Sequence, residues 1–100
     1  MTISLIATLK ARPETREELL RLLVDQVEPT RAENGCVDYN LHVDTDDPCV
    51  FVFYENWQSQ SDLDAHMKMP HLEPFLSQID RLLAEPIDIW RLHRTERAAE

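Results

Sequence analysis

The sequence contains a single glycine, Gly35, in 100 residues. Phosphate-binding loops need several closely spaced glycines, so nucleotide-binding motifs of that kind are excluded. The longest apolar run, at 49–54, is also far shorter than the roughly 20 residues that a membrane-spanning helix requires. We therefore expect neither a nucleotide bound through such a loop nor a chain that crosses a membrane.

Cysteine is limited to Cys36 and Cys49. These residues fall at opposite ends of a predicted hairpin, about 25 Å apart at about 3.3 Å per residue, so we expect two free thiols. The N-terminus lacks the basic segment and the cleavage site of a secretory signal. Together these features predict a cytoplasmic protein.

Basic residues are outnumbered, with 10 Lys and Arg against 19 Asp and Glu, which gives a formal net charge of −9. A field of this sign repels nucleic acids and anionic membrane surfaces, so neither is expected as a partner. The content of 43% hydrophobic and 29% charged residues is typical of a globular protein. Since this length allows one core, we predict a single domain over 1–100, with its core at about 3–93 and a polar tail at 94–100.

Four segments carry the alternating or mostly apolar patterns of β-strands. They lie at 3–11, 37–44, 50–57 and 87–93. An acidic turn cluster at 45–48 joins the middle two, which predicts a β-hairpin.

A first helix is predicted between the first two strands. It should begin at a capping box over 15–18 and should kink or break at Pro29, which lacks the amide proton that a helix needs. A second capping pattern at 30–33 predicts a short further turn. Gly35 then supplies the left-handed conformation that ends it.

The second helical segment starts at a Ser59 cap, restarts at Pro70 and carries apolar residues at helical spacing as far as Leu83. Pro86 stops it before the last strand. The resulting order, βαββαβ, predicts a ferredoxin-like α+β fold, in which a four-stranded antiparallel sheet carries both helices on one face.

The third predicted strand is apolar on both of its alternating sets, in Phe51-Val-Phe-Tyr54. Helices cover one face of the sheet, and uncovered Val, Phe or Tyr on the other face would form a large apolar patch. A twofold contact needs only one self-complementary surface. We therefore predict a homodimer formed through this sheet face, and the pattern leaves open which set faces the partner.

Few residues carry a pattern that predicts catalysis. His66 and His71 are close in sequence, but their spacing, with Pro70 between them, does not place two imidazoles on one helical face, so no metal site is expected. The cysteines lack a CxxC arrangement, and the serines lack a nucleophile elbow.

A group of aromatic and polar residues remains at the end of the third strand and in the helix after it. It consists of Tyr54, Glu55, Asn56, Trp57, His66 and His71. The helix returns across its sheet, so His66 can lean over a cleft that fits a flat aromatic ligand. The alternative is that His66 is a hydrogen-bonded structural residue and Trp57 belongs to the core.

Several segments together resemble the antibiotic biosynthesis monooxygenase family, including its quinol monooxygenase-like members. They run in order from about 3 to 92 and comprise Ala11-Arg-Pro-Glu14, Thr30-Arg-Ala-Glu-Asn-Gly-Cys36, Tyr39-Asn-Leu-His42, Asp46-Asp-Pro48, Phe51-Val-Phe-Tyr-Glu-Asn-Trp57, Asp64-Ala-His66 and Pro70-His71. The resemblance implies a dimeric α+β barrel of ferredoxin-like subunits. It also implies oxidation of a quinol-like or anthrol-like small molecule by dioxygen, and we expect no metal, flavin or haem.

In such a reaction a base removes a phenolic proton and the resulting anion passes an electron to dioxygen. We expect His66 to be the base or a hydrogen-bond partner, Trp57 to form a wall of the site and Asn56 to orient an oxygen atom. The residues expected to bind substrate are Tyr39, His71 and Phe75.

Arg31 and Glu33 are expected to make structural contacts at the end of the first helix. Haem degradation, which occurs among relatives, is disfavoured because 3–11 lacks the asparagine that those proteins carry on the first strand. Two alternatives stay open. One is a non-catalytic dimeric protein that binds a small aromatic molecule, and the other is an isomerase of a small metabolite, although 55–71 offers a phosphate only Lys68 and histidines.

Overall fold

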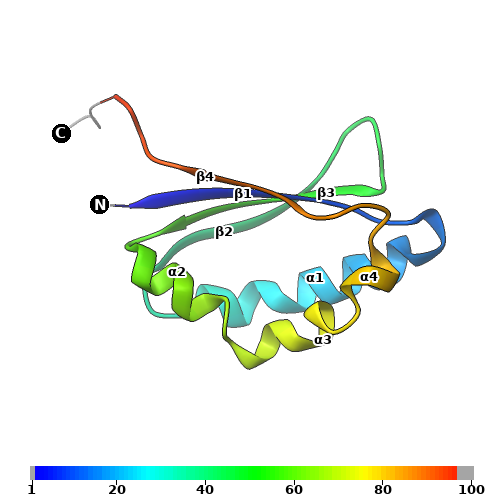
Figure 1. Ribbon diagram of the computed structural model, residues 1–100, viewed down its shortest axis with the longest axis horizontal. Helices are drawn as coiled ribbons and strands as arrows, with labels where there is room; N and C mark the ends of the chain where they lie inside the picture. Colours follow the sequence, from blue (N-terminus) through cyan, green and yellow to red (C-terminus); the bar gives the residue numbers. More distant parts are fainter. Residues whose placement is uncertain (1, 97–100) are drawn as a thin grey trace.

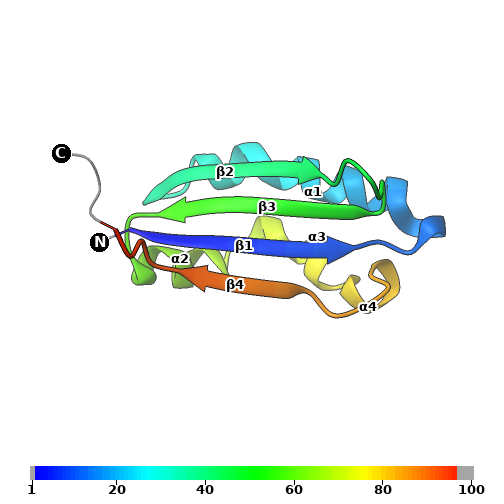
Figure 2. The same cartoon turned by 90° about the horizontal axis from the view of Figure 1, so that it is seen from above.

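The computed structural model describes residues 2–96, which form one four-stranded sheet with all helices on one side (Figure 1). The strands are β1 (Ile3–Lys10), β2 (Cys36–Val43), β3 (Val50–Trp57) and β4 (Asp88–Leu92). Their order across the sheet is β2-β3-β1-β4, and all neighbours are antiparallel (Figure 2). The predicted ferredoxin-like α+β fold is confirmed. Residues 97–100 of the predicted polar tail lie outside the described residues.

The helical layer contains one long helix and several short ones. They are η1 (Pro13–Thr15), α1 (Arg16–Arg31), α2 (Gln60–His66), η2 (Pro70–Leu72), α3 (Glu73–Leu76) and α4 (Ile79–Leu82). The predicted continuous helix after Pro70 is therefore wrong. Pro70 and Pro74 each stand in the first turn of a new segment, because proline fits a first turn but cannot continue a preceding one.

Of the kink or break expected at Pro29, the break is wrong, because helix α1 continues through Pro29 to Arg31. The residue after the proline, Thr30, is fully buried, and its Oγ1 lies 3.1 Å from Nε2 of His71. Packing of this buried turn holds the chain in a helix although Pro29 cannot donate a backbone hydrogen bond.

The predicted helix caps have different outcomes. Thr15 stands at the N-cap position of α1, but its side chain makes no capping hydrogen bond; its hydroxyl donates to the backbone oxygen of Leu82, 2.8 Å away. Ser59 does cap α2, since its Oγ accepts a hydrogen bond from the backbone N–H of Asp62. Gly35 has a φ of +80°, and a Cβ atom there would lie 2.6 Å from the Cβ of Asp62. Glycine therefore lets the loop after α1 pack tightly against the start of α2.

The core lies between the sheet and the helices. It is built from one alternating set of residues on β1 and β3, which the helices cover to 8% exposure or less: Ile3, Leu5, Ala7, Leu9, Phe51, Phe53 and Trp57. Leu19 and Leu23 of α1 pack against this set and are fully buried. The other alternating set of the same strands faces away from every helix.

The state of the two cysteines and the length of the helices bear on two further expectations. Cys36 and Cys49 are both free thiols, as predicted. Within residues 2–96, no helix has the length and hydrophobicity needed to span a membrane.

Candidate functional site

An apolar cavity of about 80 Å³ lies between the sheet and the helices. The apolar side chains around it come from β1, β3, β4 and the helical layer, and the polar residues that line it are Gln26, Tyr39, Glu55 and His66. It approaches the surface at Met67 and Ile89, which are 48% and 44% exposed. Because a water molecule needs roughly 10–15 Å³ on this scale, the cavity has room for roughly five to eight water molecules or a small organic molecule.

His66 is the last residue of α2, and its residue as a whole is only 3% exposed. Its ring centroid lies 4.7 Å from that of Trp57 and 5.6 Å from that of Tyr39. Its Nδ1 lies 2.8 Å from Oε2 of Glu33. Burial lowers the pKa of His66, while the hydrogen bond to Glu33 acts in the opposite direction.

The neutral imidazole of His66 has one donor and one acceptor nitrogen. A carboxylate only accepts hydrogen bonds, so Nδ1 carries the proton toward Glu33 and Nε2 is the unprotonated nitrogen. Among residues 2–96, Nε2 has no hydrogen-bond partner. The predicted base is thus held in the tautomer that can accept a proton.

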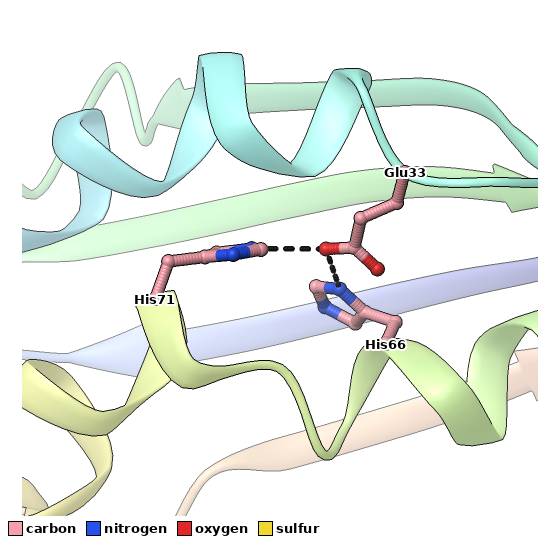
Figure 3. Close-up of side chains that lie close together, drawn as sticks. All are labelled: Glu33, His66 and His71. Atoms are coloured by element: carbon pink, nitrogen blue, oxygen red, sulfur yellow. Dashed lines mark hydrogen bonds and ion pairs between the residues drawn. The ribbon is translucent and has the colours of Figure 1, made fainter.

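Figure 3 shows the carboxylate of Glu33 between two imidazoles, those of His66 and His71. Glu33 stands in the loop after α1 and His71 in η2, and Nε2 of His71 lies 2.9 Å from Oε2 of Glu33. Glu33 and Arg31 both make contacts at the end of α1, but within residues 2–96 they do not pair with each other. Arg31 instead donates from Nε to the backbone oxygen of Tyr39, 3.1 Å away.

The residues predicted to bind substrate divide between two places. Tyr39 and Phe75 line the cavity, whereas His71 is not among the lining residues and belongs to the Glu33 cluster. The Tyr39 hydroxyl donates to Oε1 of Gln26 at 3.2 Å, and burial raises the pKa of Tyr39. The Nε2 of Gln26 is buried without a hydrogen-bond partner, so an unused donor remains beside the cavity.

Glu55 is a buried carboxyl group that belongs to the predicted group of aromatic and polar residues but was expected to have no role in catalysis or binding. It is 4% exposed, lines the cavity and accepts a hydrogen bond from Nε1 of Trp57 at 2.9 Å. Burial raises its pKa to about 7, against the effect of that hydrogen bond. In the sequence, Glu55 belongs to the same alternating set of the third strand as Phe53 and Trp57. This pattern alone places its carboxyl group on the core face of the sheet.

Trp57 is fully buried and does not line the cavity. Its ring packs against that of His66, and its Nε1 donates a hydrogen bond to Glu55. Trp57 therefore contacts two residues that line the cavity, but it does not form a wall of the cavity as predicted.

Asn56 lies on the opposite sheet face, which corrects the expectation that it orients an oxygen in the same site. Its Nδ2 donates to Oδ2 of Asp38 at 3.0 Å, and its Oδ1 accepts from the hydroxyl of Ser4. Strand alternation is the physical reason, because neighbouring residues of β3 point to opposite faces.

A row of apolar side chains crosses the open face of the sheet. In the strand register, Ile6 of β1 lies between Tyr54 of β3 and Trp90 of β4. Tyr54 is 41% and Trp90 60% exposed. Ile6, Tyr54 and Trp90 therefore form an exposed apolar surface on the face away from the helices, called the open-face row below.

Comparison with known proteins gives a consistent assignment. The family model for antibiotic biosynthesis monooxygenase matches residues 2–77. YcnE of Bacillus subtilis is 32% identical over 94 residues, which cover 94% of this chain and 99% of YcnE. Rv0793 of Mycobacterium tuberculosis is 34% identical over 87 residues, covering 87% and 85% of the two chains. The names of both relatives propose a monooxygenase activity.

The uncharacterized protein sll1783 of Synechocystis is 32% identical over 87 residues. These residues cover 87% of this chain but only 59% of the relative's length. The solved structure of Rv0793 superposes with a TM-score of 0.91 at 32% identity, covering 99% of this chain and all of the other. The structure of PA3566 from Pseudomonas aeruginosa gives a TM-score of 0.89 at 36% identity, with 95% of each chain covered. The chain therefore belongs to the antibiotic biosynthesis monooxygenase family.

Proposed function

We propose that this protein is a cytoplasmic, cofactor-independent monooxygenase that oxidises a quinol-like aromatic molecule with dioxygen inside the cavity. The observation that carries the proposal is the position of His66. Its imidazole lines an apolar cavity, its Nδ1 is held by the Glu33 carboxylate, and its Nε2 is free. This arrangement meets the geometric and tautomeric requirements of a general base.

The contact between Glu33 and His66 has a defined chemical effect. A carboxylate that accepts a hydrogen bond from one imidazole nitrogen fixes the tautomer and orientation of the ring, and it stabilises the imidazolium that forms when the other nitrogen takes a proton. At 2.8 Å, with both side chains no more than 5% exposed, the interaction is little screened by water. Glu33 is therefore proposed as the positioning residue for the base.

The proposed reaction balances with dioxygen as the only co-reactant. His66 removes one phenolic proton, and the electron-rich anion passes an electron to dioxygen. The two radicals then combine into a carbon–oxygen bond, giving a ring hydroperoxide. The proton returns to the distal oxygen, the O–O bond breaks, and water leaves as the ring carbon that bore the hydroperoxide loses its hydrogen. One quinol and one O₂ thus become one hydroxyquinone and one water.

The other groups around the cavity support this chemistry. The free Nε2 of Gln26 can donate to a substrate oxygen, and the carboxyl group of Glu55 provides a second polar contact. The apolar walls limit the access of water to reactive intermediates.

The proposed functional unit is a homodimer, joined through the open-face row. Ile6, Tyr54 and Trp90 form an apolar band across the strands, and a second copy would cover it by a twofold contact. The proposed cavity lies on the opposite face of the same sheet, so dimerisation would leave its lining in place.

Oxygen consumption by chelator-treated protein tests the proposed activity. We expect uptake above the buffer blank with one or more members of a panel of hydroquinones and anthrones. With ¹⁸O₂, one labelled oxygen should appear in the product and one in water. Absence of uptake with every compound would contradict the proposal.

The same panel separates the alternative functions. A non-catalytic binding protein would show a higher melting temperature with these ligands but no oxygen uptake. An isomerase of a phosphorylated metabolite has less support, because none of the residues that line the cavity is a lysine or arginine.

A further inference from the structure

Three metal-ligating side chains meet at one point beside the cavity. The ligand atoms of Glu33, His66 and His71 all lie within 4.8 Å of one another. They come from three separate segments, which are the loop after α1, the end of α2 and the turn η2 (Figure 3). The spacing of His66 and His71 along the chain predicted no metal site, but the fold brings Glu33 from a separate segment to the two histidines as a third ligand.

The type of ligand restricts the kind of ion. Two imidazoles and one carboxylate suit borderline divalent transition ions, whereas Mg²⁺ and Ca²⁺ prefer sets made of oxygen ligands alone. Zinc sites with three protein ligands of this kind keep a further position for water or a ligand. In a tetrahedral site with bonds of roughly 2.0–2.1 Å, neighbouring ligand atoms lie about 3.3 Å apart. The separations of 2.8 Å and 2.9 Å from Oε2 of Glu33 to the two imidazole nitrogens need to open by about 0.5 Å, and the third pair of ligand atoms lies within 4.8 Å.

A second observation also indicates a cation at this point. The side chain of Glu33 is 5% exposed, and its Oε1 is buried with no hydrogen-bond partner. Within residues 2–96, no lysine or arginine forms an ion pair with it. A buried carboxylate normally pairs with a cation or has its oxygens satisfied by hydrogen bonds.

The Glu33, His66 and His71 cluster is partly exposed to solvent and is held in place by neighbouring residues. The side chain of His71 is 23% exposed, which gives an ion a route from solvent. Thr30 is fully buried, and its Oγ1 lies 3.1 Å from Nε2 of His71, the atom that faces Glu33. Gly35, two residues beyond Glu33, lets the loop pack against the start of α2.

We propose that Glu33, His66 and His71 form a binding site for one divalent transition-metal ion of the Zn²⁺ type, with a coordination position left open. The ion would bind Nδ1 of His66, which in the metal-free protein points its proton at Glu33. The metal-bound state and the proposed base are therefore alternative states of the same histidine. Metal binding itself does not depend on the proposed oxidation.

Titration of the untagged, chelator-treated protein tests the site without any substrate. We expect one Co²⁺ per chain by calorimetry, a visible ligand-field band that grows with occupancy, and loss of that band when Zn²⁺ is added. Mg²⁺ should not compete. The metal should also raise the melting temperature, because it binds only the folded arrangement.

Variants identify the ligands. His71→Gln and Glu33→Gln should each weaken Co²⁺ binding by at least about 100-fold, since loss of a ligand costs at least as much as loss of a group that orients one. The matched control is His93→Gln, which removes an exposed histidine outside the cluster and should leave the affinity unchanged. Circular dichroism establishes that each variant is folded. If Glu33→Gln fails to fold, His71→Gln decides, because its side chain is partly exposed on a short turn.

Three outcomes would overturn the metal site. These are the absence of saturable binding by the wild-type protein, equal affinity in His71→Gln, and equal weakening in His93→Gln. Because binding is measured without substrate, a failure here leaves the oxygenase proposal intact. Equally, a lack of oxygen uptake leaves a measured metal affinity intact.

Discussion

On the helix-covered face of the sheet, β1 and β3 contribute Leu5, Phe53 and Trp57, none more than 5% exposed. On the open face the same two strands contribute Ile6 and Tyr54, and Tyr54 is 41% exposed. Strand alternation thus divides one apolar sequence into an interior surface and an exterior one. The interior surface is already packed in a single chain, whereas the exterior one would be covered only in the proposed dimer.

Polar groups differ between the faces in the same way. On the open face, Asn56 is paired with both Asp38 and Ser4, so its hydrogen bonds are satisfied within the sheet. On the covered side, Nε2 of Gln26 and Oε1 of Glu33 are buried without partners. Buried polar atoms without partners cost free energy, so these two atoms support the proposed ligand sites on the covered side.

Replacing His66 by Gln is expected to have the largest effect. If His66 is the base, the oxygenase rate should fall by something like 10² to 10⁴, because glutamine cannot accept the phenolic proton. The glutamine amide can still donate to Glu33, so the melting temperature should fall by no more than about 5 °C. Oxygen uptake and thermal unfolding measured on the same variant give both values.

The interpretation of His66 as a structural residue makes the opposite prediction. The variant would lose stability, and the activity per folded protein would be unchanged. His93→Gln serves as the control for loss of an exposed histidine and should match the wild-type protein in both measurements.

The open face can be tested with Ile6→Asp, at the centre of the open-face row. A charge without a partner in an apolar interface costs several kcal/mol, so the dissociation constant of the proposed dimer should rise by at least about 100-fold. Sedimentation velocity at micromolar concentration should show a dimer for the wild-type protein and a monomer for the variant.

Val24→Asp is the matched control, because Val24 is 52% exposed on α1 rather than on the open face of the sheet. It should leave the dimer intact. A monomeric wild-type protein, or equal dissociation by both variants, would show that the open-face row is not the interface.

The elements of the fold could be predicted because each depends on local patterns. Alternation located four strands, and Ser59 marked the start of α2 as a true cap. Alternation also separates Asn56 from Trp57, although closeness in sequence had suggested a common site. The continuation of α1 through Pro29 was not predictable in this way, because the buried packing of Thr30 outweighs the low helix propensity of proline.

The candidate site could be predicted only in part. His66, Tyr39 and Phe75 were selected from the sequence and do line the cavity. The cluster of Glu33 with His66 and His71 was missed, because its members are brought together by the packing of three segments. No spacing along one helix encodes such a contact, and the orphaned Oε1 of Glu33 is visible only in three dimensions.

The smallest expected effect concerns Glu55, the buried carboxyl group of the covered face. Burial raises its pKa from 4.5 to about 7, so between these values the folded protein binds more protons than the unfolded chain. The contribution of Glu55 to the free energy of unfolding should therefore fall as pH rises through this window, by at most about 3 kcal/mol, and stay constant above it.

Glu55→Gln keeps an acceptor for Trp57 but cannot ionise. Urea unfolding at pH 5 and pH 8 should show the variant gaining stability relative to the wild-type protein at the higher pH, while other titrating groups cancel in the difference. Parallel pH profiles for the two proteins would mean that Glu55 is not held neutral by the covered face, and the contrast between the two faces would then rest on packing alone.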